Sequence, residues 1–448
     1  MGGFGQRAQK ENQGVHDPLF AKALFLDNGQ SRLLLLTTDL ICVPTGLAAA
    51  AVEELAQDGL AADQVCICAS HTHSGPEVME FFVQTEAVQR YTGFLGKALV
   101  QVGQEARKNP LPTRLRIGTG QVDFLVNRRT KGDPNIVDPR VFALLAEEAE
   151  TQRPLAVLFG VGVHPVTLGH DNFLISADYP GVAQKQIESQ LGVQNALFFN
   201  MTEGNVIPTT RQPYNSLDTR GYVGGTFQDA EAIGLRLANE VLGILHAAPL
   251  THHNGLFARR STPKVKPNRY DLDMDTALQQ LKGYQDCIAG YIGDDFSRFT
   301  PQDLTPLSTL WARASEEVVR REMSEAEMQH LMSAVCNYFI LLQKLFNPAQ
   351  QVDVPVPIQV IGIEEYRFLA LPGEVLVEVG LDWQRRNGER GDKAFILGLA
   401  NGFMGYLPHR TNFNEPGAHY QYETLMNALE PQAMDIAVDE GERLLLPS

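Results

Sequence analysis

The sequence is poor in cysteine, in basic residues and in long apolar runs, and each shortage excludes a class of protein. Its five cysteines include no CxxC pair, and their odd number favours reduced thiols over a disulfide framework. No apolar run reaches the roughly 18 residues that span a bilayer. Residues 1–14 lack the apolar core of a signal peptide. We therefore expect a cytoplasmic protein without a membrane span.

Basic residues are outnumbered, since 37 lysines and arginines stand against 53 aspartates and glutamates and give a net charge of -16. An acidic protein of this kind is a poor partner for nucleic acid or an anionic membrane. With 44% hydrophobic and 20% charged residues, the composition is that of a globular protein with a large core. We expect a small-molecule partner, and the composition leaves a homo-oligomer open.

Apolar, β-rich runs alternate with helical stretches along most of the chain. Strands are expected within 19–40 and at 65–70, 154–163 and 195–200, and helices over 45–58, 86–107 and 225–246. Residues 261–350 begin with a polar, proline-punctuated segment and continue with helical patterns. Their apolar residues recur at three- and four-residue steps and form one expected core-facing stripe, made of Met328, Leu331, Val335, Tyr338, Leu342 and Leu345. The pattern predicts one α/β domain over residues 1–448, with layered mixed β-sheets flanked by helices and a mostly helical insertion over 262–350.

In the segment VCICASHTHSGPEV, residues 65–78, the expected strand ends at Ser70, and His71 and His73 follow it. Residues i and i+2 of an extended strand point the same way, so both rings could face one pocket at the strand's carboxyl end. The Ser-Gly-Pro that follows forces a turn, so a loop could display the rings instead. On its own, an HxH pair fits hydrogen-bonded or surface histidines as well as a metal site. Cys66 and Cys68 are expected to be small buried hydrophobes rather than ligands.

Three further candidates follow apolar strands. His164 ends the most apolar strand and, like His71, has a proline close behind it, although a lone histidine there is usually a core residue. Glu374 follows a strand and a Pro-Gly turn, where we expect it to open a helix, either as an ordinary first-turn glutamate or as a carboxylate ligand. Tyr406 lies just beyond another apolar strand, and its alternative interpretation is a packed aromatic.

Other polar residues near these strand ends have plainer interpretations. Asp178 precedes a Pro-Gly helix start, where it could orient a ligand as a hydrogen-bond acceptor but more simply caps the helix. His170, His409 and His419 lie in loops, and we expect them to be solvated or capping residues.

Four strand ends thus present His, His, Glu and Tyr. Two imidazoles and one carboxylate are a common ligand set for catalytic zinc, and they leave a position for water. Zinc lowers the pKa of that water to about 7 and polarises a carbonyl, which suits hydrolysis of an amide or an ester.

Along the chain, motifs occur in a fixed order: GVHDPLFAKALFLDNG (14–29), ASHTHSGP (69–76), VNRR (126–129), GVHPVTLGHDNFLISADYPG (162–181), LALPGE (369–374), LANGFMGYLP (399–408) and a YE pair (422–423). The set resembles the neutral/alkaline, non-lysosomal ceramidase family over nearly the whole chain. Members of that family are zinc amidases that split N-acylsphingosine into a fatty acid and sphingosine. The resemblance implies a hydrolase of linear amide carbon–nitrogen bonds, with a link to lipid metabolism.

Position by position, the resemblance also implies roles for individual residues. The implied zinc ligands are His71, His164, Glu374 and Tyr406. His73 would lie beside the metal and assist proton transfer. Arg128 of VNRR would hold an oxyanion or the substrate carbonyl, and Tyr422 would stand near the reaction centre.

The chain departs from the family pattern at three places. Ile207 stands where ceramidases carry a serine that is proposed to take part in amide attack, so a zinc-activated water is the preferred nucleophile, with Thr202 and Thr209 as alternatives. Glu77 and Val78 follow HTHSGP where ceramidases tend to have small glycines. We also expect the protein to lack the signal sequence and the C-terminal β-sandwich of secreted ceramidases. These departures favour a smaller, soluble acyl amide or ester over ceramide itself.

Other functions compete with this hypothesis. The same zinc site could catalyse ester hydrolysis or an elimination, which the loss of the serine at position 207 supports. A non-catalytic relative could bind a small ligand, although the intact set of implied ligands argues against it. A barrel amidohydrolase also uses HxH, but it needs a lysine or further histidines and a late aspartate at successive strand ends, and the sequence shows no such series.

Overall fold

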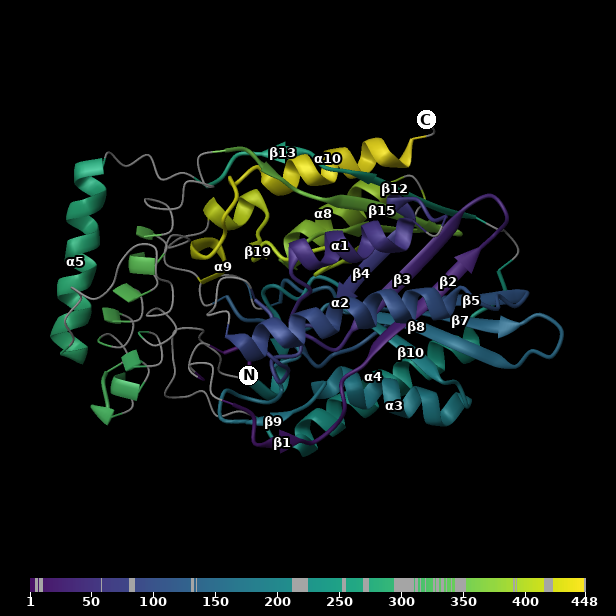
Figure 1. The fold of residues 1–448 in the computed structure, drawn as a ribbon, viewed down its shortest axis with the longest axis horizontal. Helices are drawn as coiled ribbons and strands as arrows, with labels where there is room; N and C mark the ends of the chain where they lie inside the picture. Colours follow the sequence, from purple (N-terminus) through teal and green to yellow (C-terminus); the bar gives the residue numbers. More distant parts are fainter. Residues whose placement is uncertain are drawn as a thin grey trace.

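Three larger β-sheets, each covered by helices on its outer side, form the body of the computed structural model (Figure 1). The structure describes residues 1–4, 7, 11–57, 59–79, 85–129, 133, 135–211, 225–251, 255–268 and 274–293, part of 310–342, and residues 352–389, 391, 393–414 and 422–446.

The first sheet has the order β2-β3-β4, made by Ala21–Asp27, Arg32–Thr38 and Val65–Ala69. β2 and β3 form an antiparallel hairpin, and α1 (Thr45–Ala56) carries the chain to β4, which runs parallel to β3. α1 and α2 (Glu86–Ala106) pack on one face of this sheet. The other face carries Cys66 and Cys68, which are fully buried with their sulfurs 3.8 Å apart, as expected for two small core residues.

The second sheet has the order β10-β8-β7-β5, made by Asn195–Asn200, Pro154–Val161, Arg140–Glu148 and Thr113–Gln121. β8 and β10 are parallel and are connected through α3 (Asp178–Leu191), which packs with α4 (Phe227–Ala247) on the sheet's outer face. Along β8, Val157 and Phe159 face these helices, whereas Leu158 faces the opposite core. The predicted strand buried on both faces is therefore confirmed.

The third sheet has the order β12-β15-β16-β18, made by Leu256–Ser261, Ile358–Ile363, Tyr366–Ala370 and Lys393–Leu397. α8 (Val377–Gly388) and α10 (Ala433–Leu445) cover its outer face. Its inner face contributes Phe368 and Phe395 to a core that also contains Leu35 of the first sheet and Phe142 of the second. One central core therefore joins all three sheets, and the ends of their strands can meet. The expected α/β class with layered mixed sheets is confirmed.

The described residues within the expected helical insertion have a small core of their own. α5 (Met274–Ile292) stands apart from the sheets in Figure 1, and Leu331, Val335 and Tyr338 of the expected apolar stripe are buried against it and its neighbours. Met328 and Leu345, also expected in that stripe, lie outside the described residues. A short ladder of β13 (Lys264–Val265) with β14 (Val354–Pro355) closes the insertion where it leaves the body.

Short strand pairs bring the later motifs together. β6 (Leu125–Asn127) pairs with β11 (Val206–Pro208), and β17 (Glu374–Val375) pairs in parallel with β19 (Tyr406–Leu407). The four-residue helix α9 (Tyr422–Leu425) follows β19. Within the part of the chain that the structure describes, no helix is both long enough and apolar enough to cross a membrane.

Candidate functional site

His71 enters the site from a turn rather than from an extended strand. β4 ends at Ala69, the His71 N–H donates to Leu40 O at 2.8 Å, and His71 then adopts the left-handed conformation with φ of 74°. The extended-strand explanation of HxH is therefore wrong, and the loop alternative is correct. Both rings nevertheless face one place, because His71 Nε2 and His73 Nε2 lie 3.2 Å apart.

His164 is held in the same manner as His71. It follows β8, its N–H donates to Val206 O, and the residue is fully buried. Its Nδ1 donates to Glu203 O at 2.6 Å, as the Nδ1 of His71 donates to Ile41 O at 2.6 Å. A backbone carbonyl on Nδ1 fixes the tautomer and leaves Nε2 as the free electron-pair donor, which is how metal-bound histidines are usually oriented.

Glu374 does not lie in a first helical turn, contrary to the sequence expectation. It forms β17 and lies opposite Tyr406 in the pair with β19, while α8 begins only at Val377. Gly373 allows this close approach, since an added Cβ there would lie 2.3 Å from Gly405 O. The two-residue ladder thus brings a carboxylate and a phenol to the site side by side.

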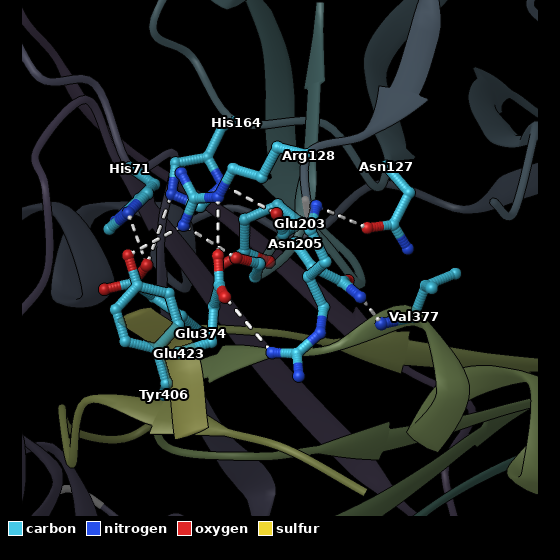
Figure 2. A network of polar contacts seen from close by, with 12 residues as sticks. His71, Asn127, Arg128, His164, Glu203, Asn205, Glu374, Val377, Tyr406 and Glu423 are labelled. Carbon is cyan, nitrogen blue, oxygen red and sulfur yellow. Dashed lines mark hydrogen bonds and ion pairs between the residues drawn. The ribbon is translucent and has the colours of Figure 1, made fainter. Parts of the chain in front are cut away.

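The carboxylate of Glu374 meets both anchored histidines. Glu374 Oε2 lies 3.3 Å from His71 Nε2 and 3.2 Å from His164 Nε2 (Figure 2). These separations are close to the edge of a tetrahedron around zinc, about 3.3 Å for ligands 2.0–2.1 Å from the ion. His164 Nε2 and Glu374 Oε2 are buried without a hydrogen-bond partner among the described residues. Converging buried electron-pair donors without hydrogen-bond partners suit a divalent cation, so the residues fit a metal ion such as zinc.

Burial and neighbouring charge keep these groups in the state that binds metal. Burial, with the nearby Arg128 guanidinium, lowers the pKa of His164 to about 4, and burial with the neighbouring histidines lowers the pKa of His73 well below its usual value. Burial alone would raise the pKa of Glu374, but His71 and His164 outweigh it and hold that pKa well below the ordinary range. Neutral imidazoles beside a carboxylate are the protonation states that a divalent cation requires.

Arg128 and Tyr406 lie at the edge of this cluster and are joined to each other. Arg128 Nη2 donates to Tyr406 Oη at 2.9 Å and to Gly204 O at 2.9 Å, and both residues are buried. The structure therefore brings together His71, His73, His164, Glu374, Arg128 and Tyr406 from the predicted set. Only the backbone of Tyr422 is described, at the start of α9, and the prediction for its side chain lies outside the described residues, as does His419.

The remaining predicted residues support or surround the site. Asp178 opens α3 behind the N-cap Ala177, so it is not the cap, and its carboxylate accepts from the N–H of Leu168 in the loop after His164. His71, His73 and His164 form one buried cluster whose ligand atoms lie within 4.8 Å of one another, and His170 and His409 lie outside it. His409 Nδ1 instead pairs with Thr411 Oγ1 at 2.8 Å.

A packed side chain lies at position 207, where the resemblance leads one to expect a serine. Ile207 is fully buried on β11, opposite Val126 of β6. Of the two alternative nucleophiles, Thr202 is buried with its hydroxyl unpartnered among the described residues, whereas Thr209 is exposed.

One residue at the site has no role in the sequence interpretation. Glu423, which directly follows Tyr422, binds Arg128 Nε at 2.9 Å and Arg129 Nη1 at 3.1 Å. The available signal was the consecutive arginines of VNRR, because two neighbouring buried guanidinium groups need a carboxylate partner.

Comparisons with known proteins support the resemblance to the neutral/alkaline ceramidases. Residues 1–219 match the family model described as neutral/alkaline non-lysosomal ceramidase, N-terminal. Among curated proteins, the chain is similar to neutral ceramidase B of Dictyostelium discoideum, 22% identical over 461 residues, and to neutral ceramidase A of the same organism, 21% identical over 463 residues. Both alignments cover 88% of this chain, and the chain spans 63% of the length of these relatives.

Two solved structures share the fold. The crystal structure of neutral ceramidase from Pseudomonas aeruginosa superposes with a TM-score of 0.71 at 20% identity, covering 100% of this chain and 72% of that chain. A ceramidase complexed with C2 gives a TM-score of 0.69 at 18% identity, covering 100% of this chain and 73% of that chain. The chain is therefore similar in sequence to the N-terminal part of the neutral/alkaline non-lysosomal ceramidases over residues 1–219, and it shares the fold of the two solved ceramidase structures over its whole length.

Proposed function

We propose that the protein is a zinc-dependent hydrolase that cleaves an acyl amide bond. The observation that carries the proposal is the convergence of His71, His164 and Glu374, with the unpartnered atoms His164 Nε2 and Glu374 Oε2 at its centre. The proposed ligands are these three residues and Tyr406, whose place beside Glu374 is fixed by the β17/β19 pair. When bound, zinc lowers the pKa of a water to about 7 and polarises a carbonyl oxygen.

The side chains around the cluster supply binding and proton transfer. Arg128 carries a fixed positive charge beside Tyr406 and is proposed to hold the carbonyl oxygen as negative charge develops on it. His73 Nδ1 is buried without a partner among the described residues, unlike the Nδ1 atoms of His71 and His164. A ring that no carbonyl anchors is suited to accept a proton from water and pass it to the leaving amine. Tyr422 is proposed to lie near the reacting carbonyl.

Water is the proposed nucleophile. Ile207 has no nucleophilic atom, and it is fully buried in the β6/β11 ladder. The water oxygen forms a bond to the carbonyl carbon, the carbon–nitrogen bond breaks, and the amine leaves with one proton from the water. The products are a carboxylic acid and an amine.

The proposed substrate is an acyl amide smaller and more soluble than ceramide. The similarity to neutral ceramidases supports the amide class. After HTHSGP, Glu77 and Val78 place larger side chains where the family tends to have glycines, and both are buried. Glu77 Oε1 accepts from the N–H groups of Val78 and Met79, and burial raises the pKa of Glu77 to about 7. We also propose that the protein is cytoplasmic, that it has a role in lipid metabolism and that it forms a homo-oligomer.

A second candidate is ester hydrolysis or an elimination at the same zinc site. It rests on Ile207, because the chain lacks the serine that the family is proposed to use for amide attack. A non-catalytic protein that binds a small ligand is the third candidate, and the complete donor set argues against it.

The first experiment measures metal content by mass spectrometry in the wild type and in His71→Ala, followed by a screen of N-acyl amides and matched esters of increasing chain length. We expect about one zinc per chain in the wild type, its loss in the variant, and faster release of amine than of alcohol. Ester turnover without amide turnover would favour the second candidate. No metal in either protein after zinc is supplied would reject the hydrolase.

A further inference from the structure

Glu423 is the carboxylate partner of the arginine pair beside the site. Its Oε1 accepts from Arg128 Nε at 2.9 Å, and both residues are labelled in Figure 2. Its Oε2 accepts from Arg129 Nη1 at 3.1 Å. The side chains of Glu423 and Arg128 are 3% and 4% exposed, and that of Arg129 is fully buried. Both oxygens of one carboxylate are therefore used to hold two adjacent guanidinium groups out of water.

This pairing fixes the direction in which Arg128 points. The guanidinium is planar and presents its donors in a rigid fork, so a bond to Nε determines where the Nη atoms lie. With Glu423 on Nε, Nη2 is directed to Tyr406 Oη and Gly204 O. If the Arg128 side chain adopted another rotamer, Nη2 would no longer donate to the Tyr406 hydroxyl.

Glu423 is itself placed by the helical insertion. It lies on α9, and Met426, one residue beyond this helix, packs against the insertion's core. The following residues are tied to the insertion's base, since the Asn268 N–H donates to Ala428 O at 2.8 Å and the Glu430 N–H donates to Lys266 O at 2.9 Å. α9 is therefore linked through Glu423 to the arginine pair, and the residue that follows it, Met426, is in contact with the insertion's core.

We propose that Glu423 is a positioning residue that holds Arg128 toward Tyr406, and that the helical insertion sets its place through Met426 and the segment after α9. The role rests on the proposed function, because Arg128 is there the residue that holds the substrate carbonyl. It gives the insertion a function in the reaction, although the described part of the insertion contributes no residue to the metal cluster.

The first test compares Glu423→Gln and Glu423→Asp in the zinc-loaded full chain. Glutamine keeps the shape but removes the charge, and we expect kcat to fall about 10- to 100-fold, as when an outer partner of a site residue is removed. KM should change by less than about threefold, because the loss falls on the transition state. Aspartate keeps the charge and should recover part of kcat.

A matched control is Glu147→Gln. Glu147 is also a buried glutamate that pairs with an arginine, at 3.1 Å from Arg116 Nε, but it lies on β7 outside the site. Its substitution should leave kcat and KM unchanged. An unchanged kcat in folded Glu423→Gln would overturn the proposal, as would an equal loss in Glu147→Gln.

The second test observes Arg128 itself and needs no turnover. In protein labelled with ¹⁵N in its arginine side chains, the Arg128 Nε–H signal, assigned by its loss in Arg128→Lys, should exchange slowly. Glu423→Gln should shift this signal, and Met426→Ala should speed its exchange while Met426→Leu restores it. If Glu423→Gln does not fold, the Met426 pair still decides the link to the insertion.

The two tests separate the two failures. If the wild type hydrolyses no amide or ester but the Arg128 signal responds to Glu423→Gln and not to Glu147→Gln, the proposed function fails and the positioning of Arg128 stands. If the wild type is active but neither Glu423→Gln nor Met426→Ala changes kcat or the Arg128 signal, the positioning role is overturned and the proposed function stands.

Discussion

The site joins two regions of the chain that contribute different atoms. The N-terminal region, residues 11–211, supplies the nitrogen donors of His71, His164 and Arg128, whereas the C-terminal region, residues 352–446, supplies the oxygen donors of Glu374 and Tyr406. The family match covers residues 1–219, so it includes the first region and neither oxygen ligand. Neither region alone contains the proposed ligand set, and the common core of the three sheets brings the two halves together.

The two regions also hold their donors by different means. Each anchored imidazole follows a strand of a large sheet and is fixed by a backbone carbonyl on Nδ1. Glu374 and Tyr406 instead depend on each other, through a ladder of two residues each and the close approach at Gly373. The positions of the two histidines are thus fixed by large sheets. The positions of Glu374 and Tyr406, called here the oxygen half of the site, depend on one short strand pair, so a substitution should displace them more easily.

The largest expected effect comes from removing one donor of each kind. His164→Ala should abolish zinc retention, and Glu374→Gln, which keeps the shape but not the charge, should weaken zinc binding and activity together. Zinc content after dialysis measures both. His246→Ala is the matched control, because His246 is exposed near the end of α4. Full zinc occupancy in His164→Ala would remove His164 from the ligand set, and an unaffected Glu374→Gln would do the same for Glu374.

The second prediction concerns a substitution that disturbs the β17/β19 pair and changes no proposed ligand. In Gly373→Ala, the new Cβ would lie 2.3 Å from Gly405 O, and overpacking of this kind costs about 1–3 kcal/mol of the free energy of unfolding. We expect zinc affinity to fall because Glu374 and Tyr406 shift together. Gly388→Ala on α8 is the control, since nothing lies within 4 Å of its added Cβ. Unchanged zinc affinity in Gly373→Ala would show that the oxygen half does not depend on this pairing.

The sequence was sufficient for the parts of the fold that long patterns determine. β10 spans 195–200 as expected, and β4 and α4 differ from the expected ranges by one or two residues at their ends. His71, His164, Glu374 and Tyr406 were found because each follows an apolar strand, whereas Arg128 and Tyr422 came only from the family resemblance. The local geometry was not predictable. Two-residue strands are too short for alternation to appear, which is why Glu374 was placed in a helix. The positive φ of His71 follows from tertiary contacts of its turn, not from its residue type.

The third prediction concerns acid and the metal-free protein. The pKa of His164 is about 4 in the fold against 6.5 for an ordinary histidine, so the unfolded chain binds more protons between these values. The stability that the neutral ring contributes is therefore complete above pH 6.5 and is lost as the pH falls toward 4. Chemical unfolding of the metal-free protein at several pH values should show this slope, reduced in His164→Ala and retained in His246→Ala. A slope that His164→Ala leaves unchanged would assign the acid sensitivity to other groups.

The smallest expected effect on zinc content is that of Ile207→Ser. This variant tests whether the N-terminal region contributes only nitrogen donors or also a nucleophile. Ile207 is not one of the proposed ligands, so zinc content should equal that of the wild type. Loss of a buried aliphatic side chain should cost about 2–5 kcal/mol of unfolding free energy, and this is measured separately. If water is the nucleophile, amide turnover per folded, zinc-loaded chain should stay within about threefold of the wild type, because no transition-state contact is removed. A large gain in ceramide hydrolysis would instead mean that the serine alone separates this chain from the ceramidases. Ile207→Ala, which makes a similar cavity without a hydroxyl, distinguishes that gain from an effect of the added space.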